Sequence, residues 1–165
     1  MNRARRFWYG LTLVLSLCVP LAYSTSAGDD WLPIPPEDLA LKDNPAQTGA
    51  HAMILYRESA VNEKYASTDG AYITEYVRIK VFTKEGTDEG NVEIPFRKES
   101  ADIKDIRART IHSDGSIVNF EGKPFEKTVE KRSGEKFLAK TFSLPDVQPG
   151  CIIEYKYRID RKSVV

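Results

Sequence analysis

The sequence predicts an all-β fold, an antiparallel β-sandwich, and three observations lead to this prediction. Beyond Gly49, apolar residues recur at every second position in several segments, which is the period of a half-buried strand. Turn-forming pairs such as Asp114-Gly115 stand between these segments. No segment beyond residue 50 keeps a helical period for three turns. A chain of 165 residues, 41% of them apolar, has enough material for one packed core.

Residues 1–28 predict a secretory signal peptide. Three arginines lie within the first six residues, an apolar stretch follows over residues 7–21, and small residues continue to Gly28. A membrane anchor is the alternative, but it needs about 20 unbroken apolar residues, and this stretch is shorter and contains Pro20. A lipoprotein would use Cys18, yet Leu17 is too large for a lipidation motif. We therefore expect export to the periplasm or the extracellular space, with no membrane span after cleavage.

Charge and cysteine content exclude several classes of protein. Lys plus Arg number 24 and Asp plus Glu number 24, and removal of the leader makes the net charge −3. A nucleic-acid-binding protein normally carries a basic excess, so we expect no nucleic-acid partner. The mature chain would keep only Cys151, which excludes an internal disulfide and a multi-cysteine zinc module.

Residues 29–49 predict a proline-rich arm in front of a β domain that spans residues 50–165. Four prolines favour extended and turn conformations in this arm. Between them, Glu37–Leu41 are expected to form one helical turn, because Pro36 suits its first position and acidic residues follow. We expect Trp31 to anchor the arm to the β domain.

Residues 151–159 form the clearest predicted strand. One face is apolar and the other is mostly charged, the first with Cys151, Ile153, Tyr155, Tyr157 and Ile159, the second with Ile152, Glu154, Lys156 and Arg158. This pattern predicts a strand with one buried face and one charged face. Residues 72–82 alternate in the same way. Further strands are predicted over 51–57, 102–112, 116–120, 125–131 and 136–143.

Proline and glycine mark the ends of these strands. Ile94-Pro95-Phe96 predicts a strand end or a sheet edge, because Pro95 has no N–H to donate. Residues that tolerate a positive φ stand at Asp69-Gly70, Glu85-Gly86, Asp114-Gly115 and Ser133-Gly134. Asp114-Gly115 gives the best hairpin prediction, since Thr110-Ile111 precedes it and Ile117-Val118 follows.

The segment Phe142–Gly150 (FSLPDVQPG), followed by the alternating strand 151–157, resembles a bacterial exported domain of unknown function. That domain precedes transglutaminase-like domains, and the resemblance covers roughly residues 30–160. It implies a supporting or positioning role beside a domain with a Cys–His–Asp triad. The printed sequence reaches Val165 without such a domain, so we expect a fragment, a separately encoded module or a truncated product. An incomplete sandwich would leave an unpaired strand edge.

The candidate catalytic residues each have a structural interpretation that the pattern favours. Cys151 as a nucleophile would need His51 or His112 as its base, but its alternation with Ile153 predicts a core position. His112 and Asp114 could form an acid–base pair, yet a solvated turn explains them. Acidic residues without the spacing of a calcium loop are interpreted as solvated; these are Asp88, Glu89, Asp102 and Asp105.

We therefore predict no catalytic, cofactor-binding or metal-binding residues and no cofactor. The leading hypothesis is a non-enzymatic exported module that supports or positions a transglutaminase- or peptidase-like domain or its substrate. The alternative is a free-standing module that binds cell-envelope glycans or peptides, through an open strand edge or through tyrosines such as Tyr72, Tyr76, Tyr155 and Tyr157. A third hypothesis is an enzyme centred on His112 and Asp114.

Overall fold

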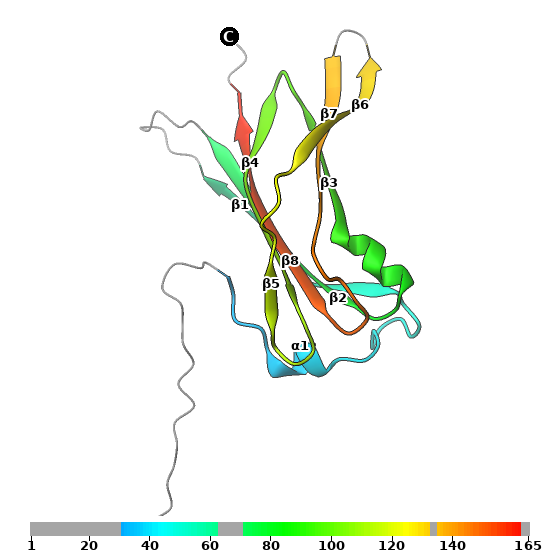
Figure 1. Cartoon of the computed structure of the whole chain (residues 1–165). Coiled ribbons are helices and arrows are strands. Elements are labelled where there is room, and N and C mark those ends of the chain that lie inside the picture. The colour runs from blue at the N-terminus through cyan, green and yellow to red at the C-terminus, as the bar shows by residue number, and fades with distance from the viewer. Residues whose placement is uncertain (1–30, 63–70, 133–134, 163–165) are drawn as a thin grey trace, which may run out of the picture. The chain divides into compact units, whose positions relative to one another are not determined.

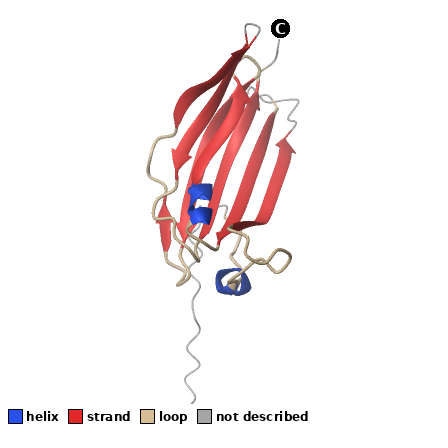
Figure 2. Ribbon diagram, turned by 90° about the vertical axis from the view of Figure 1, so that its right-hand side faces the viewer, coloured by secondary structure: helices blue, strands red, loops and turns tan. Residues whose placement is uncertain are grey.

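The computed structural model describes residues 31–62, 71–132 and 135–162, and they form two antiparallel sheets that pack face to face (Figure 1). One sheet has five strands in the order β1-β2-β8-β4-β5, and the other has three in the order β3-β7-β6. Strands dominate the described part of the chain, and helices are confined to two short segments (Figure 2). The predicted all-β sandwich is confirmed.

Eight strands and two short helices make up the described elements. In chain order they are α1 (Pro36–Ala40), β1 (Ala52–Asn62), β2 (Tyr72–Val81), the 3-10 helix η1 (Glu85–Gly90), β3 (Asn91–Arg97), β4 (Ala101–Ile111), β5 (Ile117–Asn119), β6 (Phe125–Arg132), β7 (Glu135–Ser143) and β8 (Ile152–Arg161). The predicted strands are all present. β1 extends beyond its expected end at residue 57, because its ladder with β2 continues to the pair Asn62–Tyr72.

The core lies between the two sheets, and β8 contributes to it from the centre of the five-stranded sheet. The predicted apolar face of β8 is confirmed, since Cys151 and Ile153 are almost fully buried. Buried apolar residues from the neighbouring strands complete the core, including Val77, Ile79 and Val81 of β2, Ile103 and Ala108 of β4, Val92, Ile94 and Phe96 of β3, and Leu138 and Phe142 of β7. Alternation along each strand places these side chains on one face.

The proline and hairpin predictions hold. β3 is an edge of the three-stranded sheet, and Pro95 lies in it opposite Ala139. The Asp114-Gly115 hairpin joins β4 to β5 with the expected pairs, Thr110 opposite Val118 and Ile111 opposite Ile117. Gly115 has a φ of 85°, a conformation that glycine adopts without a steric penalty. Asp69-Gly70 and Ser133-Gly134 lie outside the described residues.

The structure corrects the interpretation of Glu85-Gly86. This pair opens η1, and Gly86 is not among the glycines with a positive φ. Glycine is needed there for space, because a Cβ at residue 86 would lie 2.1 Å from the carbonyl oxygen of His51. That oxygen also accepts a hydrogen bond from the amide of Phe82 at 2.9 Å. The absence of a side chain at Gly86 therefore lets η1 lie close against the residue that precedes β1.

The helical turn in the proline-rich arm is confirmed as α1, with Pro36 at its first position and Glu37 and Asp38 in its first turn. The chain divides into two units, Met1–Leu32 and Pro33–Val165, and every described helix and strand belongs to the second. The predicted signal peptide lies outside the described residues, and the anchoring role of Trp31 stays a prediction. Within the described ranges, neither helix has the length and apolar character of a membrane-spanning segment.

We predict that Gly86→Ala destabilises the fold. The added methyl group would overlap the His51 carbonyl, and such overpacking costs about 1–3 kcal/mol. Denaturant unfolding followed by circular dichroism measures the loss. Asp88→Ala is the matched control, since Asp88 is exposed in the same helix and its replacement should change stability by less than about 0.5 kcal/mol. Equal unfolding midpoints for the two variants would contradict the prediction.

Candidate functional site

The face of the five-stranded sheet that points away from the core, here called the outer face, is polar at its centre and yet buried. The sequence predicts a charged face for β8, but Glu154 and Lys80 are 0% exposed and Arg78 is 4% exposed. One apolar and one charged face are present as predicted, but the expectation of a half-buried strand is wrong for the middle of this sheet, where the charged face is buried as well. Buried charges need partners, because an unpaired ion in a medium of low dielectric constant is costly.

Cross-strand register supplies the partners of Glu154. Arg78 of β2 and Arg109 of β4 lie directly opposite Glu154, one on each side of β8. The Nε of Arg78 donates to Oε1 at 2.6 Å, and the Nε of Arg109 donates to Oε2 at 2.7 Å. The hydroxyl of Tyr76 also donates to Oε1. Both carboxylate oxygens thus accept charge-assisted hydrogen bonds, and these bonds join three adjacent strands.

The tyrosines divide between the two faces of the sheet. Tyr76 lies on the outer face, with the ammonium group of Lys156 4.6 Å from its ring centroid. Burial and the hydrogen bond to Glu154 raise the pKa of Tyr76 well above its usual value, so its hydroxyl keeps its proton. Tyr155 and Tyr157 pack against the core, and burial raises the pKa of Tyr157 to about 12. The four tyrosines named above therefore do not form one aromatic platform.

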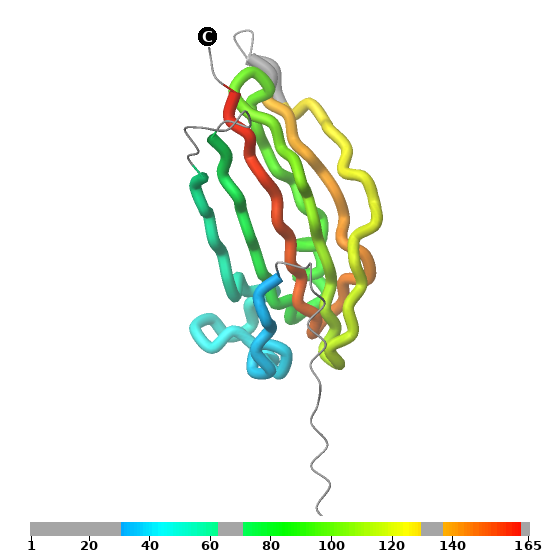
Figure 3. Tube along the Cα trace, turned by 90° about the vertical axis from the view of Figure 1, so that its left-hand side faces the viewer, coloured from blue at the N-terminus to red at the C-terminus, as the bar shows by residue number. Residues whose placement is uncertain are grey.

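Lys80 ties the arm to the sheet. Its Nζ donates to the carbonyl of Leu39 in α1 at 2.9 Å and to the carbonyl of Gly150 at 2.8 Å. Asp38, also in α1, lies 3.9 Å from the guanidinium of Arg78. Burial lowers the pKa of Lys80, since removal from water disfavours its charge. Figure 3 shows the blue segment that contains α1 at the lower end of the five-stranded sheet.

The loop over residues 144–150, which carries the resemblance, closes the same end of the sandwich. Its backbone is fastened on two sides, because the amide of Leu144 donates to the carbonyl of Gly90 and the hydroxyl of Thr110 donates to the carbonyl of Pro145. Leu144 is 6% exposed, and Val147 packs against the core. The loop therefore seals the core.

His112 clamps this loop from the end of β4. Its Nε2 lies 3.1 Å from the carboxylate of Asp146, and its Nδ1 lies 2.9 Å from the amide nitrogen of Gln148. With a carboxylate at one nitrogen and an amide N–H donor at the other, the imidazole ring donates from Nε2 and accepts at Nδ1. Asp146 has a φ of 52°, a strained conformation for a residue with a side chain, which the clamp helps to hold.

The structure does not pair His112 with Asp114. The carboxylate of Asp114 instead accepts hydrogen bonds from the amide and hydroxyl of Ser116, and these bonds lower its pKa. His51 is exposed, and its ring contacts Thr83 at 3.0 Å. Cys151 is 1% exposed and its thiol belongs to the core cluster. In the described structure, His51, His112 and Asp114 thus each contact a residue other than the catalytic partner that the sequence suggested, and the thiol of Cys151 packs in the core.

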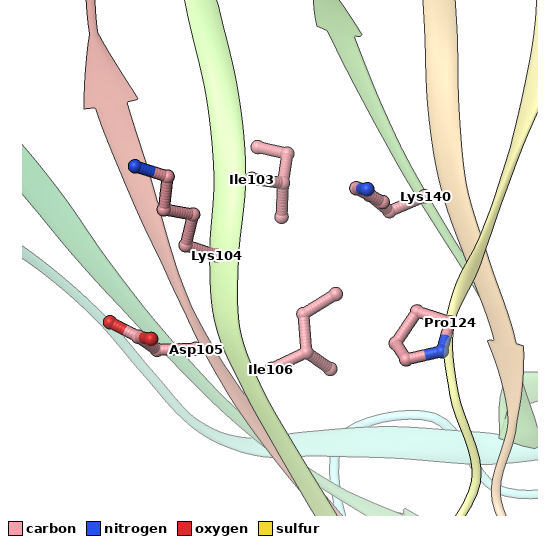
Figure 4. Close-up of a pocket in the computed structure, with 6 residues that line it drawn as sticks. All are labelled: Ile103, Lys104, Asp105, Ile106, Pro124 and Lys140. Atoms are coloured by element: carbon pink, nitrogen blue, oxygen red, sulfur yellow. The ribbon is translucent and has the colours of Figure 1, made fainter.

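A shallow pocket of about 190 Å³ opens between β4 and the β6–β7 side of the other sheet (Figure 4). It is lined by Ile103, Lys104, Asp105, Ile106, Pro124 and Lys140. Its charged groups already have partners, since Lys104 binds Asp160 and Lys140 binds Glu126, both at 2.8 Å. No group of three or more His, Cys, Asp or Glu side chains able to hold a metal ion occurs among the described residues.

Sequence reasoning missed the Arg78–Glu154–Arg109 cluster. The alternation placed Glu154 on the polar face of β8 correctly, but it gave no sign that an arginine lies on each side. One signal could have found the cluster. Glu154 is the one acidic residue on the polar face of the predicted strand 151–159, and two other predicted strands carry basic residues on their polar faces. Using that signal requires the strand order.

We predict that Glu154→Leu strongly destabilises the protein, by about 3–5 kcal/mol, because it leaves two buried guanidinium groups without their carboxylate. Glu126→Gln is the matched control, since it breaks the exposed pair with Lys140 and should cost about 1 kcal/mol or less. Chemical denaturation measures both. Replacing Arg78, Glu154 and Arg109 together by Met, Leu and Met should recover most of the loss. Equal losses in the single variant and the control would refute a structural role for the cluster.

Comparisons with known proteins agree with the fold and with the resemblance. No curated protein matches the chain. The crystal structure of a putative protease from Parabacteroides distasonis is similar, with a TM-score of 0.54 and 18% sequence identity over 69% of this chain and 24% of that chain. The chain thus corresponds to about a quarter of the length of that protein.

A second comparison uses sequence alone. The family described as a domain of unknown function with a solved structure, DUF3857, matches residues 68–165, which include β2 through β8 and the loop over 144–150. The match confirms the resemblance to a domain of unknown function. The chain belongs to the DUF3857 family.

Proposed function

We propose that this protein is a non-catalytic, exported β-sandwich module that supports or positions a transglutaminase- or peptidase-like domain or the substrate of that domain. One observation carries the proposal. Among the described candidates for nucleophile and base, Cys151 and His112 are both committed to holding the fold, and the exposed ring of His51 contacts Thr83.

Cys151 lacks the surroundings of a catalytic thiol. A nucleophilic cysteine reacts as the thiolate, which needs access to substrate and a lowered pKa. The side chain of Cys151 is buried in the core, and this burial raises the pKa of the thiol. The neutral, inaccessible form is therefore favoured at physiological pH.

His112 likewise has no nitrogen available to take a proton from a substrate. One ring nitrogen contacts Asp146 and the other contacts Gln148. The side chain is only 12% exposed. A general base must reach the proton that it removes, and this geometry uses both nitrogens within the clamp.

The comparison with the putative protease supports the association with another domain. The matching fold makes up 24% of that chain, so in that protein the sandwich is joined to a longer polypeptide. A role beside a peptidase-like domain is consistent with this arrangement, and the reaction itself would belong to the other domain.

We predict that the purified protein hydrolyses neither peptide nor ester substrates above the rate of a Cys151→Val variant, which preserves an apolar core side chain. A thiol-specific chromogenic reagent should label Cys151 in the wild-type protein only after unfolding, because burial blocks access and raises the pKa of the thiol. Turnover that Cys151→Val abolishes, together with rapid labelling of the native protein, would overturn the proposal.

A second candidate, a peptide-binding module, is favoured by one further observation. Ile54 and Val61, both on the edge strand β1, are 55% and 60% exposed. Exposed apolar residues beside an open strand edge are typical of a surface to which another strand can be added.

A further inference from the structure

The edges of the two sheets differ in how well they are protected against pairing with another strand. Among the described strands, β5 has only three residues, β3 contains Pro95, and β6 is highly charged and has a register shift between Thr128 and Glu130. These features discourage strand addition. β1 also has a register shift, between Ile54 and Tyr56, but it forms a regular ladder with β2 from Tyr56 to Asn62 and contains neither proline nor lysine. Figure 3 shows β1 as the outermost strand on the left.

The side of β1 that continues the core face carries exposed apolar residues. Ile54 lies opposite Ile79 of β2, and Val61 lies opposite Ile73. The register shift between Ile54 and Tyr56 restores the alternation, so Ile54 and Val61 project from the same side of the sheet. Both are more than half exposed, which shows that the three-stranded sheet does not cover this side of β1 between Ile54 and Val61, here called the margin.

A polar group lies between these two apolar residues. The hydroxyl of Ser59 donates to Oε1 of Glu75 at 2.6 Å, and Arg57 lies 4.0 Å from Oε2 of the same carboxylate. Oε2 of Glu75 is buried and has no hydrogen-bond partner, whereas the side chain of Arg57 is 62% exposed. Oε2 of Glu75 is thus enclosed and not open to a partner, whereas the margin offers one cation, Arg57, that is open to a further carboxylate.

We propose that the outer edge of β1, with which no other described strand pairs, binds an extended peptide strand. The partner would pair through its backbone and place apolar side chains over Ile54 and Val61, a hydroxyl beside Ser59, and a carboxylate beside Arg57. This inference rests on the proposed substrate-positioning role and names its partner class, a β-strand peptide with apolar residues at both ends of a polar, acidic centre.

The strand geometry fixes the sequence of a probe. Because successive side chains alternate, residues 1, 3, 5 and 7 of an antiparallel peptide would face Val61, Ser59, Arg57 and Ile54. The probe is the end-capped peptide Val-Thr-Thr-Thr-Glu-Thr-Val with a fluorescent label, and its binding to the purified protein is measured by fluorescence anisotropy. Two control peptides carry N-methyl groups on one or the other alternate set of backbone amides.

We predict that the probe binds and that one N-methylated peptide does not, because only one set of amides faces β1. Val61→Lys and Ile54→Lys should weaken binding. Arg57→Glu should weaken it by up to about tenfold, and a peptide with Lys in place of Glu should restore it, since the cross-strand charges are exchanged. The matched control is Val129→Lys, an equally exposed valine on the other sheet, which should leave binding unchanged.

Several outcomes would overturn the assignment. These are no binding at the solubility limit of the probe, equal binding of both methylated peptides, or an equal loss in Val129→Lys. Dimerisation through β1 without peptide, detected by light scattering and abolished by Val61→Lys, would assign the edge to a second copy instead. Circular dichroism of each variant verifies folding. Cleavage of the probe, read by mass spectrometry, would count against the proposed function alone, because binding is measured separately.

Discussion

Glu154, held between Arg78 and Arg109, is the interaction on which the arrangement of the five-stranded sheet depends. A buried ion cluster adds little net stability over an apolar one, but a misplaced charge in such a site is expensive. A one-residue slip of β8 would turn Glu154 toward the core, and a two-residue slip would separate it from both arginines. The cluster therefore selects one register for β2, β8 and β4.

Polar side chains at the end of the sandwich that holds α1 and the loop over 144–150 fix these two segments to the sheet. Lys80 joins α1 and Gly150 to the sheet, while His112 holds the loop over 144–150 in a strained conformation. The loop over 144–150 is thus a structural closure of the sandwich. The polar side chains named above fix loops and strands, and the proposed surface for another chain is the margin of β1.

Local patterns predicted most of the fold because strand periodicity needs no knowledge of neighbours. The alternation around Ile153 identified β8 and its core face, the missing N–H of Pro95 identified an edge, and Asp114-Gly115 identified a hairpin. The extension of β1 and the 3-10 character of η1 escaped prediction. The first depends on the ladder with β2, and the need for glycine at residue 86 of η1 depends on the nearby carbonyl of His51.

The sequence by itself determined which residues form strands and which side of β8 is apolar. It could not determine that the charged side is buried and paired, because the groups that contact it come from segments far apart in the chain. Arg78 is 76 residues from Glu154, and Arg109 is 45 residues away. Only the tertiary order, with β8 between β2 and β4, brings these charges within hydrogen-bonding distance. Periodicity is a local property of a chain, whereas the environment of a charge is set by whichever strands the fold places beside it.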